Sequence, residues 1–419
     1  MNEFIFKNYG FDGKVTTFSY GYGDLHYEES VTFEVGQWYD EAVLERAMFL
    51  AFLTIGTSYY KAFPSAHVRF EVGRLDEWQA EFCNKIYQEG MSQFAFENGL
   101  RREDLAQFSA NGGQSTTSVS YDGRGVLSLQ SGGKDSLLLA TLLQKAGHSF
   151  TPWYITSGET HPQVLDMLGE PLVVARRYID MPTLREAATQ GGKNGHVPVT
   201  YIVESLALIQ TILLGKNTVL AAIAHEGEEP HEWIGDLPVN HQWSKTWQAE
   251  QYFAEYVQRY ISPDIRVGSP LRQFSELKVT ELFALHAWER FGAKFSSCNE
   301  ANYKQGSDNT ELTWCGHCPK CANSYLLFSP FISATELQSR LGGELYQKPE
   351  LLETFKGLLG IEGVMKPFEC VGEVDELRAA YHLSQHAGYA PLPFEVPTSD
   401  FDKDSMYTAQ PWASDTIDL

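Results

Sequence analysis

The chain has 419 residues, of which 43% are hydrophobic and 13% aromatic, a composition typical of a folded globular protein with two or three domains. Its formal net charge of -22 argues against a protein that holds a long nucleic acid, because such binding needs a basic face. The first seven residues lack a signal peptide's apolar core, and no apolar stretch is long enough to span a bilayer. We expect a cytoplasmic protein that binds neither nucleic acid nor membranes, whose oligomeric state the sequence leaves open.

The N-terminal pattern predicts a separate α+β domain over residues 1–108. Residues 4–11, 15–22 and 25–35 alternate apolar and polar side chains between Asp-Gly and Gly-Asp turn signals, which predicts an antiparallel meander. A helical period follows from Asp40 and again over residues 77–98. Residues 109–123, rich in Ser, Thr and Gly, predict a linker.

The next segment contains Ser131-Gly132-Gly133-Lys134-Asp135-Ser136, between an apolar run at residues 126–129 and a helical pattern from 137. This order predicts strand, tight turn and helix. The glycines allow close backbone approach, and the amides at a helix N-terminus suit a phosphate. The spacing is not that of Walker A, and the alternative is an ordinary Gly-rich turn.

The hexapeptide resembles the loop of the PP-loop ATP pyrophosphatases. That superfamily cleaves ATP between its α and β phosphates and often activates a carboxylate as an adenylate. The resemblance implies an adenine nucleotide alpha hydrolase-like fold and predicts that the six residues bind ATP. Lys278, which follows a Pro-Leu turn, resembles a basic position that many PP-loop enzymes place near the phosphates.

Residues 124–297 predict a mostly parallel, doubly wound α/β sheet. Residues 150–156, 171–174 and 218–224 are typical of short buried strands, and 201–214 of a helix. Ligands bind at the carboxyl ends of such strands. This places His225, directly after the third strand, near the predicted site, followed by a polar loop that contains His241 and Lys245.

Four cysteines, Cys298, Cys315, Cys318 and Cys321, predict a metal knuckle. Four thiolates can surround a tetrahedral zinc and leave no open position, which makes such a site structural. An iron–sulfur cluster and unliganded core cysteines are the alternatives. A similar zinc knuckle follows the PP-loop domain in the 7-cyano-7-deazaguanine synthase branch. We predict a knuckle and helical region over residues 298–386 and an acidic tail over 387–419.

Most of the chain resembles the MurL family, the UDP-N-acetylmuramoyl-L-alanyl-L-glutamate epimerases. The resemblance rests on residues 59–61, 99–100, 129–136, 239–245, 314–321 and 366–372. It implies inversion of the terminal L-glutamate of UDP-MurNAc-L-Ala-L-Glu to D-glutamate, with ATP and Mg²⁺, in peptidoglycan precursor synthesis.

This chemistry suggests roles for individual residues. Adenylation would remove the negative charge of the glutamate α-carboxylate, so that a side chain can take the neighbouring proton and return one from the opposite face. Asp135 is then expected to position Mg²⁺. Candidates for the catalytic group are His225, His241, Cys370 and Lys245, the lysine as a cation for substrate carboxylates or phosphates. For Cys370, a buried structural thiol is the competing interpretation.

Two other functions remain open from the sequence. One is another adenylating PP-loop enzyme, such as a 7-cyano-7-deazaguanine synthase-like or thiolation enzyme, which would consume ammonia or a sulfur donor. The other is a noncatalytic nucleotide-sensing scaffold, which would bind ATP without releasing AMP.

Overall fold

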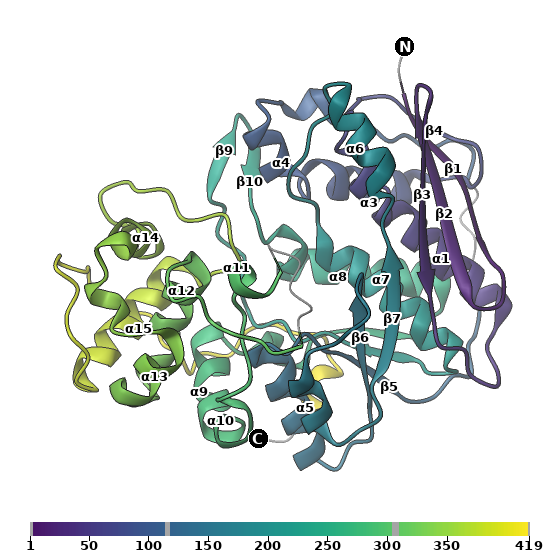
Figure 1. Ribbon diagram of the computed structural model, residues 1–419. Helices are drawn as coiled ribbons and strands as arrows, with labels where there is room; N and C mark the ends of the chain where they lie inside the picture. Colours follow the sequence, from purple (N-terminus) through teal and green to yellow (C-terminus); the bar gives the residue numbers. More distant parts are fainter. Residues whose placement is uncertain (1–2, 114–117, 304–309, 418–419) are drawn as a thin grey trace.

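The computed structural model describes residues 3–113, 118–303 and 310–417, and part of the predicted linker falls outside them. At its centre is a nine-stranded sheet of order β11-β8-β5-β6-β7-β3-β2-β1-β4 (Figure 1). The strands are β1 (Phe4–Phe11), β2 (Val15–Tyr22), β3 (Leu25–Thr32), β4 (Val68–Phe70), β5 (Val126–Leu129), β6 (Thr151–Thr156), β7 (Val173–Tyr178), β8 (Thr218–Leu220) and β11 (Arg266–Gly268). A separate two-stranded ribbon pairs β9 (Glu232–Ile234) with β10 (Leu237–Val239).

The sheet has a parallel half and an antiparallel half. Strands β11, β8, β5, β6 and β7 are parallel, which confirms the predicted mostly parallel sheet. Strands β1, β2 and β3 form the predicted antiparallel meander, and β1 and β2 have the predicted bounds. The third predicted strand, 25–35, ends earlier, at Thr32, and the one predicted over 171–174 runs from Val173 to Tyr178.

The two halves meet where β3 pairs with β7 in antiparallel register, with Val31 opposite Arg177. The Arg177 guanidinium binds the fully buried Glu29 carboxylate through Nε at 2.7 Å and Nη2 at 3.1 Å. The region predicted as a separate N-terminal domain therefore shares one sheet with the parallel strands. One hydrophobic core also continues from the meander beneath the parallel strands.

Helices cover both faces of the sheet. The α-helices are α1 (Glu41–Ile55), α2 (Thr57–Tyr60), α3 (Glu77–Gln88), α4 (Ser92–Glu97), α5 (Lys134–Lys145), α6 (Met181–Thr189), α7 (Val199–Leu213), α8 (Trp247–Tyr256), α9 (Glu276–His286), α10 (Trp288–Phe291), α11 (Asn299–Asn302), α12 (Pro319–Phe328), α13 (Ala334–Leu341), α14 (Leu352–Leu358) and α15 (Val374–His386). Helices α1, α7 and α8 contribute to one core, and α5, α9 and α12 to another. This arrangement matches the predicted doubly wound sheet.

The long helix predicted over residues 77–98 is two helices, α3 and α4. The interruption contains Gly90, where an added Cβ would lie 2.5 Å from the Ile86 carbonyl and 2.9 Å from the Trp243 ring. The glycine thus lets an aromatic side chain from a distant segment pack against the break. Local periodicity cannot reveal such a contact.

The C-terminal region forms a helical lobe beside the sheet, seen on the left in Figure 1. Residues 387–417 pack back on the molecule: the Tyr407 amide donates to the Gln273 carbonyl at 3.0 Å, and Lys403 binds Glu281 at 2.8 Å. Among the described residues, the helices are too short or too polar to cross a bilayer.

Candidate active site

The predicted phosphate loop connects β5 to α5 as strand, turn and helix. Gly132 has φ 79°, in the left-handed region, and an added Cβ there would lie 2.6 Å from Leu312 Cδ1. The loop is closed by its own hydroxyls: Ser136 Oγ accepts from the Ser131 amide at 3.3 Å, and Ser131 Oγ accepts from the Gly133 amide at 3.3 Å. The loop conformation thus requires glycine at 132.

A cavity of about 330 Å³ lies against this loop, at the carboxyl ends of β5 and β8. Four residues of the loop line it, as expected for a parallel sheet. The remaining walls come from the end of β5, α7, the segment after β8, the turn before α8, and three segments between residues 296 and 370. The lining residues are Leu129, Gln130, Ser131, Gly133, Asp135, Ser136, Val199, Thr200, Val203, Glu204, Ala221, Ala222, Ile223, Lys245, Ser296, Ser297, Asn299, Tyr303, Lys320 and Cys370.

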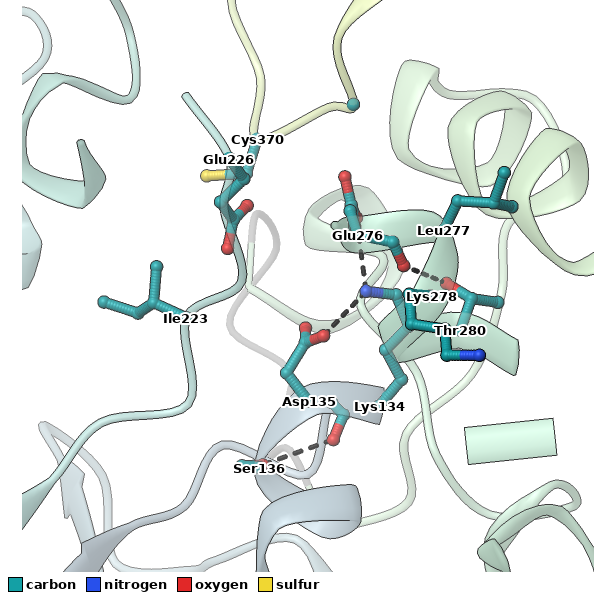
Figure 2. Close-up of polar contacts among 12 residues, drawn as sticks. Lys134, Asp135, Ser136, Ile223, Glu226, Glu276, Leu277, Lys278, Thr280 and Cys370 are labelled. Atoms are coloured by element: carbon teal, nitrogen blue, oxygen red, sulfur yellow. Dashed lines mark hydrogen bonds and ion pairs between the residues drawn. The ribbon is translucent and has the colours of Figure 1, made fainter. Parts of the chain in front are cut away.

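Lys134 begins α5 and is buried behind the loop. Its Nζ lies 2.7 Å from Asp135 Oδ1 and 3.2 Å from Glu276 Oε1, as Figure 2 shows. Burial by itself would lower the pKa of the Lys134 ammonium, but the two carboxylates outweigh it and raise that pKa above its ordinary value. The loop therefore carries a permanent positive charge at its helix end.

A second charged group lies where the helical region meets the cavity. Lys245 Nζ is 3.4 Å from Glu226 Oε2, and the Lys320 ammonium donates to the Cys370 carbonyl. Burial would lower the pKa of Lys245, whereas Cys370 and Glu226 raise it, so the lysine remains charged. Lys245 and Cys370, distant in sequence, thus come together beside the phosphate loop.

Lys278 and His225, both predicted site residues, do not line the cavity. Lys278 Nζ binds Glu281 at 2.7 Å and Asp404 at 2.6 Å, and in Figure 2 its side chain points away from Lys134. The His225 ring stacks on Tyr407, with centroids 3.8 Å apart, and burial lowers its pKa to about 4.

His241 also lies outside the lining, in a group of three imidazoles that we call the histidine cluster: His196, His231 and His241. The His241 ring centroid lies 4.5 Å from that of His196 and 6.4 Å from that of His231. Burial lowers the pKa of His241 to about 4 and those of His196 and His231 to about 3. All three rings are therefore neutral at pH 7.

The four predicted metal cysteines come together. Their Sγ atoms all lie within 4.8 Å of one another, and three pairs are 3.6 to 3.7 Å apart: Cys298 with Cys318, Cys315 with Cys321, and Cys318 with Cys321. A tetrahedron of zinc–sulfur bonds of about 2.3 Å has sulfur–sulfur edges of about 3.8 Å. The sulfur spacing therefore suits a single tetrahedral metal ion.

Family models match both parts of the chain. The model for the MurL N-terminal domain matches residues 1–269, and the model for the MurL C-terminal domain matches residues 294–391. The chain belongs to the MurL family. The first match crosses both predicted boundaries of the linker, as does the sheet that joins β3 to β7.

Curated relatives in the MurL family are similar over most of their length. Two proteins named UDP-N-acetyl-alpha-D-muramoyl-L-alanyl-L-glutamate epimerase come from Xanthomonas oryzae pv. oryzae and Salinispora tropica. The first is 33% identical over 80% of this chain and 74% of its own length. The second is 31% identical over 94% of this chain and 87% of its own length. A protein of the same name from Micromonospora sp. is 30% identical over 82% and 75%.

Sequence reasoning missed several residues of this MurL site. Glu226 follows the predicted His225, and Lys320 stands between two of the metal cysteines, so both lay inside segments already singled out. Glu204 is the one charged residue in the fifteen residues of α7, an anomaly that is visible in the sequence. Gln130 directly precedes the predicted phosphate loop, and its Oε1 is buried without a hydrogen-bond partner among the described residues.

Proposed function

We propose that this chain epimerises the terminal L-glutamate of UDP-MurNAc-L-Ala-L-Glu to D-glutamate, an isomerase reaction of peptidoglycan precursor synthesis that uses ATP and Mg²⁺. The names of its relatives support the substrate and the reaction. The observation that carries the proposal is one cavity, which joins the loop from Ser131 to Ser136 to Lys245 and Cys370. It combines a phosphate site with groups able to transfer protons.

The chemistry accounts for this combination. The glutamate α-carboxylate attacks the α-phosphorus of ATP, which forms an acyl-adenylate and releases pyrophosphate. This mixed anhydride has lost the carboxylate's negative charge, so the α-proton becomes acidic enough for a side chain to remove. Return of a proton from the opposite face inverts the carbon, and water then releases AMP and the D-glutamyl product. Each turnover therefore cleaves one ATP.

The loop residues have separate roles in this proposal. The amides of Gly132 and Gly133, with both serine hydroxyls, bind phosphate oxygens, and Lys134 supplies positive charge. Asp135 and Glu276 offer the carboxylate oxygens that Mg²⁺ prefers, and the ion would offset phosphate charge during adenylyl transfer. Both carboxylates contact Lys134 at hydrogen-bonding distance, so they would have to give up part of this contact to hold the ion.

Of the four predicted catalytic residues, the cavity favours two. Cys370 offers a thiol that can carry a proton, and the charged Lys245 in the same cavity can hold a substrate carboxylate. His225 and His241 lie outside the lining, and their low pKa values leave them as weak bases. We therefore assign proton transfer on one face of the α-carbon to Cys370.

We propose that the four-cysteine centre holds a structural Zn²⁺. The sulfur spacing supports one ion, because the cysteines of a four-iron cluster bind separate irons and hold their sulfurs farther apart. Four thiolates fill a tetrahedral shell, which leaves no position for a substrate. The centre would then hold the segment that places Lys320 at the cavity.

The test is incubation with UDP-MurNAc-L-Ala-L-Glu, ATP and Mg²⁺ in deuterated water, with chiral analysis of glutamate and an AMP assay. We expect D-glutamate that carries α-deuterium, and AMP only when the dipeptide is present. Cys370→Ser should form AMP while exchange falls by more than tenfold, and His225→Asn is the matched variant outside the cavity. Unchanged L-glutamate without exchange, from folded and metal-loaded protein, would exclude the proposal.

A further inference from the structure

Glu204 is a buried carboxyl group that faces the cavity without a partner. It lies on α7, is 7% exposed, and lines the cavity with Val199 and Val203 of the same helix. Within the described parts of the chain, its side chain makes no hydrogen bond or ion pair. Burying an unpaired carboxyl costs free energy, and a ligand that pairs with it recovers that cost.

The walls of the cavity that Glu204 lines are mostly apolar. They include Leu129 at the end of β5 and the segment 221–223 after β8. Gln130 adds a second polar group, since its buried Oε1 has no hydrogen bond to any residue that the structure describes. An apolar pocket with a few polar groups inside it suits a flat heterocycle that has hydrogen-bonding edges.

The charges nearest to Glu204 set its protonation. Burial and, to a smaller extent, the Glu250 carboxylate on α8 raise the pKa of Glu204 to about 8, although Arg272 opposes the shift. A neutral carboxyl has one O–H donor and one C=O acceptor. The strongest electrostatic partners of Lys245 are different ones, led by Cys370 and Glu226. Glu204 and Lys245 therefore have different strongest partners, although Arg272 acts on Glu226 as well as on Glu204.

We infer that Glu204 binds the adenine base of ATP, accepting a hydrogen bond from the 6-amino group and donating one to N1. The inference rests on the proposed use of ATP. With the phosphates at the loop, the base must enter another part of the same cavity, and the apolar walls beside the loop bury a ring. Lys245, Lys320 and Cys370 are left for the glutamate end of the substrate.

The test compares ATP with purine riboside 5′-triphosphate, which lacks the 6-amino group, by calorimetric titration of the wild type and two variants. The wild type should bind ATP about fivefold to tenfold more tightly, the worth of one neutral hydrogen bond. Glu204→Leu has nearly the same size and no polar atoms, so the ratio should fall to about one. Glu204→Gln keeps a donor and an acceptor, so the ratio should persist.

A second measurement follows the affinity of the wild type for ATP as a function of pH. Between pH 7 and pH 9 the wild-type carboxyl loses its proton and its donor, so ATP should bind about tenfold more weakly. Because Glu250 and Arg272 are unchanged in Glu204→Gln, that variant controls for their titration and should show a flat profile.

The outcomes separate the inference from the proposed function. An unchanged ligand ratio in Glu204→Leu, with normal ATP-dependent epimerisation in the wild type, would overturn only the base contact. Loss of deuterium exchange in Glu204→Gln at unchanged ATP affinity would overturn it in favour of proton transfer. A wild type that binds neither nucleotide and epimerises without AMP would overturn both.

Discussion

The junction between β3 and β7 allows a quantitative prediction. Glu29 is fully buried there and accepts hydrogen bonds from Arg177 and from the Tyr59 hydroxyl, the latter at 2.8 Å. Arg177→Met removes the cation and leaves the carboxylate buried with one neutral donor. Breaking one side of a buried ion pair costs about 3 to 5 kcal/mol. We expect Arg177→Met to lower the free energy of unfolding by that amount.

The chain contains a matched exposed pair. Arg69 contacts Glu3 at the same 2.7 Å, but their side chains are 44% and 36% exposed, so Arg69→Met should cost about 1 kcal/mol or less. Urea unfolding, monitored by circular dichroism, measures the loss of stability in both variants. Glu29→Gln in the Arg177→Met background removes the stranded charge and should recover part of the loss. Equal losses in the two single variants, or a double variant less stable than Arg177→Met, would refute the argument.

Three further predictions concern the site and its surroundings. Cys298→Ser should lower the metal content from one zinc per chain to none and reduce the melting temperature; stoichiometric iron in the wild type would contradict the zinc assignment. Gly132→Ala should reduce AMP formation by at least about tenfold, since its φ is 79° and its Cβ would meet Leu312; Leu312→Ala should rescue it partly. The histidine cluster has folded pKa values of about 3 to 4, below the ordinary 6.5, so the unfolded chain binds more protons as the pH falls through 6.5. The free energy of unfolding should then drop between pH 6.5 and pH 5, by at most about 2 kcal/mol per histidine. A urea midpoint of unfolding that does not change over this pH range would contradict the prediction.

Local sequence patterns predicted much of the fold and the conformation of the loop from Ser131 to Ser136. The bounds of β1 and β2 follow from alternating side chains and the glycines of their turns. The strand, turn and helix around Ser131 to Ser136 are likewise encoded within some twenty adjacent residues. The four cysteines could be grouped from the sequence because three of them lie within seven residues. Each of these features depends on residues that are close in the chain.

Contacts between distant segments account for what the sequence did not show. Lys278 follows a suitable turn, yet Asp404, 126 residues away, holds its ammonium outside the cavity. His225 is at the end of a predicted strand, but the returning C-terminal segment covers it with Tyr407. Asp404 and Tyr407 are both far in sequence from the residues they contact, so the local sequence patterns around Lys278 and His225 could not predict either contact.

The sequence by itself determined the strand, turn and helix of the predicted phosphate loop, the grouping of the four cysteines and the alternating strands, because local geometry and short spacing specify them. Only the tertiary structure decided that the meander and the parallel strands form one sheet. It also placed Glu204, Lys245 and Cys370 around one cavity. They are close together because α7, the turn before α8 and the segment between α14 and α15 pack against one another. Such long-range packing produces no periodic pattern in the sequence of the residues that it brings together.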